Sequence, residues 1–325
     1  MRKPVAILII PLLLLLAPAG ALFAQDYTSA EVLKDMESIA QSFSTLFGEN
    51  VGSISLIGDP IGYSVIPHFS VGIAGGLAFV PIENINAGGD TQYDLGELKY
   101  TPVPSVGVNL KLTLSKFELG AKVAGIPSME GGEDATRWQI QSMVVGGKLR
   151  YGLIDKHRGV FQYGVSAGGF YEFTRGDVGL NLSDTIEVYE EVDPLSPGEE
   201  HVANLNTTSA FDSTWRGHTV GGEVQGNVKV LFVNLFAGGR VSTSWGKATT
   251  SIDGDVTVQS VYPGYTVESP TESVDVTTEA KPGGIDFYGF GGLEFKILPV
   301  VLGVRGGYNF SNQVITLDFG TRLQF

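Results

Sequence analysis

The order of apolar and polar residues divides the chain into three parts. Residues 1–24 begin with Arg2 and Lys3, continue through an apolar run from Val5 to Leu16, and end in small residues. Over residues 28–47 the apolar positions recur with the period of a helix, and from residue 67 onward they alternate with polar positions. These patterns predict a secretory signal peptide, one amphipathic helix and a long series of β-strands.

The alternating part contains ten strand candidates. The clearest has Val106, Val108, Leu110, Leu112 and Leu114 on one face and Gly107, Asn109, Lys111 and Thr113 on the other. In all ten candidates every charged residue lies on the polar face. The predicted strands are 68–80, 104–114, 116–126, 141–154, 159–174, 218–230, 232–246, 284–297, 299–310 and 313–325.

The connections between these strands alternate between short and long. The long ones are 81–103, 127–137, 175–217 and 247–283, and short turns follow the second, fourth, sixth and eighth strands. This asymmetry is typical of transmembrane β-barrels, whereas a soluble β-sandwich would give no reason for it. We therefore predict an all-β, transmembrane antiparallel barrel of about ten strands. The count becomes 12 or 14 if loops 81–103 and 247–283, which we interpret as projecting hairpins, add strands to the wall.

The chain ends with the alternating strand ITLDFGTRLQF. With this ending it resembles the outer-membrane β-barrel proteins of Gram-negative bacteria, whose last strand ends in Phe. The resemblance implies that Phe325 and Leu323 form an assembly signal, that the barrel-assembly machinery and outer-membrane lipid are partners, and that the protein lies in the outer membrane. The predicted domains are the signal peptide at 1–24, the helix and its connection at 25–66, and the barrel at 67–325.

Composition limits the partners further. The chain has no cysteine, which excludes disulfides and a lipid anchor on cysteine. Its formal charge of −14 argues against nucleic acid as a partner. The four long connections hold 22 of the 35 acidic residues and only six basic ones. Within them, Asp253 and Asp255 are candidates for a Ca²⁺ site.

Paired glycines in the middle of seven strands predict room inside the barrel. We expect this room to hold water, a ligand or the N-terminal helix, with residues 28–66 acting as a plug. Inward-facing side chains are then candidates for the ligand path. These candidates are Phe170, Phe236, Tyr288, Phe290, Lys111, Arg150, Glu223, Arg240 and Arg305.

Catalytic chemistry has little support in the sequence. The four histidines are isolated, and no phosphate-binding loop, dinucleotide fingerprint or zinc-protease spacing occurs. We expect no cofactor and no enzymatic activity. The best lead for a hydrolase at the outer rim is His201, which follows Glu199 and Glu200 in an acidic segment.

The inward aromatics and the N-terminal helix are similar to features of the outer-membrane transporters of long-chain fatty acids and hydrocarbons. The chain departs from that family in having about ten strands instead of fourteen and no Asn-Pro-Ala plug motif. The leading expectation is passage or uptake of a small solute, for which a hydrophobic compound is one candidate. The alternative is a structural or surface-interaction barrel that acts through its long acidic external loops.

Overall fold

The structure, a computed structural model, describes residues 40–41, 44, 68–81, 100–133, 136–191, 200–262, 265–268, 272–282, 284–297 and 299–325. Residues 40, 41 and 44 are helical, and the rest of the predicted signal peptide, helix and plug lies outside the described residues. Within the described part, no helix is long and apolar enough to cross a membrane.

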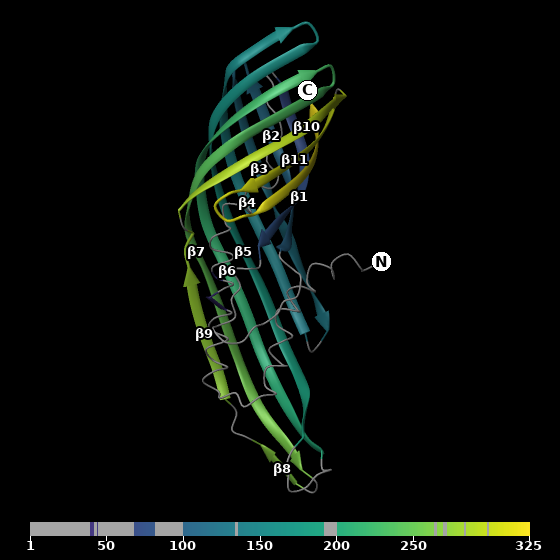
Figure 1. The fold of residues 1–325 in the computed structure, drawn as a ribbon, viewed down its shortest axis with the longest axis vertical. Helices are drawn as coiled ribbons and strands as arrows, with labels where there is room; N and C mark the ends of the chain where they lie inside the picture. Colours follow the sequence, from purple (N-terminus) through teal and green to yellow (C-terminus); the bar gives the residue numbers. More distant parts are fainter. Residues whose placement is uncertain are drawn as a thin grey trace.

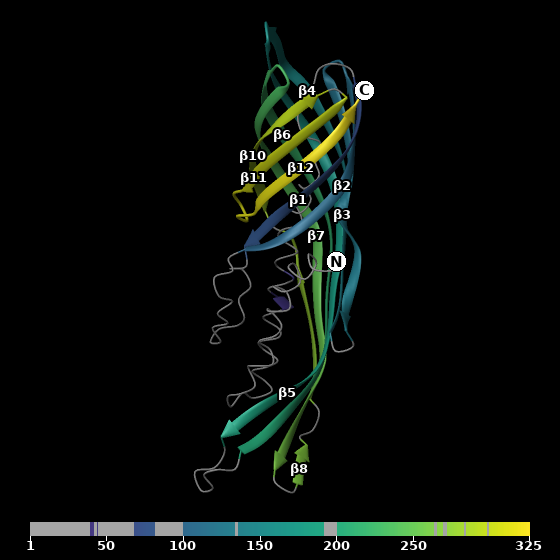
Figure 2. The same cartoon turned by 90° about the vertical axis from the view of Figure 1, so that its right-hand side faces the viewer.

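Ten antiparallel strands form a closed barrel, as the alternation predicts (Figures 1 and 2). Its wall consists of β1 (His68–Pro81), β2 (Tyr100–Leu114), β3 (Phe117–Glu133), β4 (Thr136–Arg158), β5 (Phe161–Glu191), β6 (Glu200–Val230), β7 (Val233–Tyr262), β10 (Ile285–Ile297), β11 (Val300–Asn309) and β12 (Ile315–Gln324). Pairing of β1 with β12 closes the ring, so the wall has no free edge. Two further strands, β8 (Tyr265–Glu268) and β9 (Glu272–Ala280), pair with β7 outside the wall.

The two ends of the barrel differ. Tight turns join β2 to β3, β4 to β5, β6 to β7 and β10 to β11 at one end. The last residue, Phe325, also lies at this end, where its backbone exchanges hydrogen bonds of 2.8 and 3.1 Å with Phe69. In outer-membrane barrels the short turns are periplasmic, so the opposite end faces the outside of the cell.

An apolar band surrounds the barrel. Exposed Val, Leu, Ile and Phe side chains cover its outer face, and aromatic residues gather at both borders. At the periplasmic border the rings of Phe117 and Tyr151 lie 5.0 Å apart, and at the external border the rings of His218 and Trp245 stack at 5.5 Å. The 13 residues from His218 to Val230 span about 30 Å along the barrel axis at a tilt of about 40°. This height matches the hydrocarbon core of a bilayer.

Four strands continue far beyond the apolar band. β5 and β6 each have 31 residues, β7 has 30 and β4 has 23. The prediction of loops at 127–137 and 175–217 was therefore wrong, because most of these residues form an external sheet. The interpretation of 247–283 as a projecting hairpin agrees with the pairing of β8 and β9 with the extended part of β7. In Figures 1 and 2 this sheet extends well below the barrel and ends near β8.

The external sheet escaped the strand prediction because its apolar face is reversed. In the membrane the apolar side chains point outward to lipid. Beyond the membrane the buried apolar residues occupy the inward positions instead, and the outward positions are polar. The buried residues are Val178, Leu180, Phe211, Trp215, Ala248, Ile252 and Val276. A search for one continuous apolar face therefore ends at the membrane border.

Candidate functional site

The interior of the barrel is crossed by buried ion pairs. Near the periplasmic end, the Glu118 carboxylate on β3 lies 2.8 Å from Lys111 Nζ on β2 and 2.8 Å from Arg150 on β4. All three side chains are almost completely buried. Charges buried in this way are stable only when they are paired, so the three residues form one interdependent group.

Glu223 on β6 is the centre of a second group. Its carboxylate lies 3.0 Å from Lys148 Nζ on β4 and 2.8 Å from Arg240 on β7, and Arg150 Nε stands at 3.8 Å. Arg150 also donates a 2.8 Å hydrogen bond to Gln225. Arg150 therefore connects the Glu223 group to the Glu118 group.

A third group lies on the last strands. Glu294 on β10 accepts a 2.6 Å hydrogen bond from Arg322 on β12 and a 2.9 Å bond from Asn234 on β7. Glu294 and Arg322 are also close enough to Lys111 on β2 to interact with it electrostatically. The charged groups thus act on one another across the interior.

Among the described residues three further ion pairs belong to this network, the longest being that of Lys296 with Glu294 at 3.9 Å. Lys122 on β3 pairs with Glu172 on β5 at 2.7 Å, and Arg305 on β11 pairs with Asp318 on β12 at 2.7 Å. Through these pairs every wall strand except β1 contributes a charged side chain to the interior network.

Aromatic rings occupy the space above the inward glycines. A Cβ atom on Gly221 would lie 2.6 Å from the Phe170 ring, and one on Gly238 would lie 2.6 Å from the Phe290 ring. Phe236 covers Gly292 and Tyr288 covers Gly307 in the same way. The expectation that the glycine pairs leave open interior room was wrong at these positions, because rings from neighbouring strands fill it.

The nine predicted lumen residues all point inward and are buried, each with at most 8% of its surface exposed. Five of them belong to the ion-pair network, and the other four are the aromatic rings that cover the inward glycines. The two sets are in contact, since the Arg240 guanidinium lies 4.3 Å from the centre of the Phe170 ring. Their partners Glu118, Lys148 and Glu294 were not among the predicted site residues. Glu118, Lys148 and Glu294 occupy inward positions of β3, β4 and β10, and this alternation was the signal that could have identified them.

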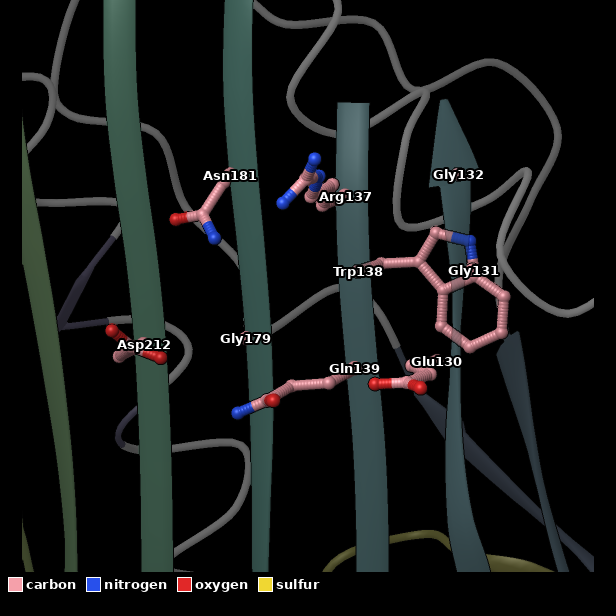
Figure 3. Close-up of a pocket in the computed structure, with 9 residues that line it drawn as sticks. All are labelled: Glu130, Gly131, Gly132, Arg137, Trp138, Gln139, Gly179, Asn181 and Asp212. Atoms are coloured by element: carbon pink, nitrogen blue, oxygen red, sulfur yellow. The ribbon is translucent and has the colours of Figure 1, made fainter. Parts of the chain in front are cut away.

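A groove of about 540 Å³ lies on the external sheet, outside the barrel interior. It crosses β3 to β6, and Figure 3 shows the side chains around it. Gln139, Gly179 and Asp212 are ladder partners in one row. The side chains of Gln139 and Asp212 reach over the glycine, where a Cβ atom would lie 3.0 Å from Gln139 Cγ and 2.9 Å from Asp212 Oδ1. Glu130 and Arg137 add one charge of each sign. No pattern along the chain indicated this groove, because it depends on strand pairing outside the membrane.

The remaining candidates lie on the same external sheet. Asp253 and Asp255 are exposed on β7, where Asp253 pairs with Asp275 across the ladder and Asp255 accepts a 2.8 Å hydrogen bond from Ser273. Among the described residues, no cluster of three or more His, Cys, Asp or Glu side chains is arranged to hold a metal ion. The backbone of Glu200 and His201 lies at the start of β6, opposite Glu190 and Glu191.

Several solved structures share the barrel architecture, and they are outer-membrane β-barrels. The outer-membrane protease OmpT from Escherichia coli is 9% identical, with a TM-score of 0.40 over 82% of this chain and 99% of its own. The translocator domain of the autotransporter NalP from Neisseria meningitidis is 10% identical, with a TM-score of 0.31 over 80% and 88%. Ail, the attachment invasion locus protein of Yersinia pestis, is 11% identical, with a TM-score of 0.28 over 80% and 99%.

Among curated protein sequences no relative matches this chain. The sequence profile of one family, by contrast, matches residues 19–325, which include the whole barrel and its external sheet. The chain therefore belongs to the Lsa36-like family.

Proposed function

We propose that this outer-membrane barrel is a closed membrane anchor that displays a binding surface outside the cell. The ligand is a basic segment of an extracellular macromolecule, and the groove on the external sheet receives it. One observation carries the proposal. Buried ion pairs cross-link the membrane part from within, while four strands continue into a sheet that holds the groove.

The length of the external sheet supports a role in binding. From Phe173 at the membrane border to the end of β5 at Glu191 there are 18 residues, which correspond to about 60 Å of strand. A wall that only had to enclose a pore would not need strands of this length. The external sheet instead places its polar outer face far from the lipid.

The chemistry of the groove favours a basic ligand. Glu130 and Asp212 supply carboxylates, and Gln139 and Asn181 supply amide oxygens as further acceptors. Arg137 lies among them and can bind an acidic or carbonyl group of the same ligand. The surrounding acidic residues strengthen the attraction of a cationic partner at long range, an effect that salt screens over about 8 Å.

Two shortened hairpins test this proposal. Deleting residues 184–207 joins the ladder partners Ser183 and Thr208 and retains the groove, whereas deleting 178–213 joins Asp177 to Thr214 and removes it. An Asn-Gly turn closes each hairpin. Binding of a fluorescent oligolysine peptide to the folded barrel should survive the first deletion and be lost in the second. Oligoglutamate is the control peptide and should not bind to either.

Point variants separate the groove from general negative charge. Glu130→Gln with Asp212→Asn removes two charges at the groove, and Asp253→Asn with Asp275→Asn removes two exposed charges from β7 and β9. The groove pair should weaken oligolysine binding at least tenfold more than the pair on β7 and β9. Equal effects would contradict a defined site and would mean that oligolysine binds to the acidic surface as a whole.

Passage of a small solute, the leading expectation from the sequence, requires a path through the interior. Such a path would have to separate Glu118, Glu223 and Glu294 from their cations. Rapid uptake of a hydrophobic solute by vesicles that contain the barrel would favour transport over the anchor proposed here.

A further inference from the structure

Two rows of side chains follow one another on the lipid-facing side of β5, β6 and β7. In the first row, Phe173, His218 and Trp245 are direct cross-strand neighbours. In the second row, two residues farther from the periplasm, Arg175 pairs with Arg216 and Arg216 pairs with Lys247. We call the first the aromatic row and the second the cationic row.

The cationic row points away from the barrel interior. Arg175, Arg216 and Lys247 are exposed, whereas their chain neighbours Thr174, Trp215 and Ala248 are buried. Among the described residues, Lys247 is the member of this row that forms an ion pair. Its Nζ lies 3.1 Å from the carboxylate of Glu279, and both side chains are largely exposed. Two guanidinium groups are therefore presented at the surface.

Such a row is unfavourable by itself. Like charges directly opposite each other on adjacent strands destabilise a sheet. The external parts of the chain hold 22 acidic and only six basic residues, and three of those six stand side by side in this row. Lys281 is a fourth, exposed and directly after Ala280, the ladder partner of Ala248. A concentration of cations on such an acidic surface indicates an anionic ligand.

The position of the row identifies where that ligand lies. The aromatic row marks the border of the apolar band, since His218 contacts Phe173 at 5.1 Å and stacks on Trp245 at 5.5 Å. Aromatic belts of this kind lie at the level of lipid headgroups. The cationic row is about 6.6 Å farther along the strands. Its charges therefore reach the layer in which lipid phosphates lie.

We propose that the cationic row binds the phosphate groups of lipids in the outer leaflet. Each guanidinium of Arg175 and Arg216 can hold a phosphate through two parallel hydrogen bonds, and Lys247 adds a third positive charge. The aromatic row packs against the acyl end of the same lipid. This contact holds the acidic external sheet at a membrane surface that would otherwise repel it.

Native mass spectrometry of the full-length barrel in maltoside micelles tests this site. The probes are dioleoyl phosphatidic acid, dioleoyl phosphatidylcholine and inorganic phosphate. The variant is the triple change Arg175→Gln, Arg216→Gln and Lys247→Gln. The charge-matched control is Lys116→Gln, Lys156→Gln and Arg158→Gln, which removes three exposed cations at the periplasmic end.

The wild-type barrel and the control should retain phosphatidic acid in preference to phosphatidylcholine. The triple variant should bind it about 100-fold more weakly, from three charges near the headgroup layer. An unchanged affinity in the triple variant, or an equal loss in the control, would overturn the proposal. Displacement of the lipid by millimolar inorganic phosphate would identify a site for free phosphate and would also overturn it. Because the row lies outside the groove, none of these results depends on oligolysine binding.

Discussion

Glu223 offers the sharpest test of the interior ion-pair network. The change Glu223→Gln keeps the size of the side chain and removes its charge. Three cations then lose their shared partner: Lys148 at 3.0 Å, Arg240 at 2.8 Å and Arg150 at 3.8 Å. The Glu223 side chain has only 2% of its surface exposed, so water cannot replace the lost carboxylate without entering the barrel.

Removing one partner of a buried ion pair costs about 3–5 kcal/mol, because the remaining charge stays buried and uncompensated. With a slope of roughly 2 kcal/mol/M in urea, the midpoint of unfolding should fall by about 1.5–2.5 M. The matched control is Glu279→Gln, which breaks the exposed pair with Lys247. That change should cost at most about 1 kcal/mol.

The assay is urea unfolding of the barrel in phosphatidylcholine vesicles, followed by tryptophan fluorescence. If the barrel interior is dry and its charged groups are paired, Glu223→Gln will lower the urea midpoint far more than Glu279→Gln. Similar midpoints for the two variants would contradict this expectation. They would mean that water already solvates the interior cations and that the barrel contains an open aqueous path.

Three further results follow from the geometry of the wall. Gly238→Ala places a Cβ 2.6 Å from the Phe290 ring and should destabilise the barrel by about 1–3 kcal/mol in the same urea assay, whereas Gly239→Ala, which faces lipid, should have little effect. Trp245 fluorescence should be quenched more strongly by lipids brominated near the headgroup than by lipids brominated deep in the acyl chains, and the reverse order would contradict its interfacial position. Deleting Phe325 removes two backbone hydrogen bonds from the seam between β1 and β12 and should slow folding into vesicles, measured by the shift in gel mobility.

The membrane part could be predicted well from the sequence. Strict alternation from Val106 to Leu114 and the charges confined to one face define strands with a lipid side and an interior side. All ten wall strands were predicted, with ends that differ from the structure mainly where strands continue outward. The ring closure follows from chemistry as well, because an unpaired edge at β1 would leave backbone groups unsatisfied in lipid.

The external sheet could not be predicted in the same way. Its strands keep the period of two, but the apolar side changes from outward residues such as Tyr171 to inward residues such as Leu180. The solvent changes from lipid to water at this border, and the pattern changes with it. Recognising the sheet requires the position of the membrane, which is known only once the barrel has been built.

The candidate sites were partly predictable for a related reason. The alternation along each strand identifies Glu223 and Arg240 as inward-facing. It does not give the distances between charged groups on different strands, which decide whether these groups form a network. The groove and the cationic row depend on cross-strand neighbours such as Arg175 and Arg216, which are 41 positions apart in sequence. No local pattern along the chain contains that information.

Conductance in planar bilayers shows whether the ion pairs close the interior of the barrel. Two forms of the purified, folded protein are compared, the chain from residue 25 onward and the same chain without residues 25–50. If the ion pairs centred on Glu118, Glu223 and Glu294 close the interior, neither form will give channel steps. Steady channels in the longer form would contradict the closed anchor. Channels in the shortened form alone would transfer the closing role from the ion pairs to the N-terminal segment.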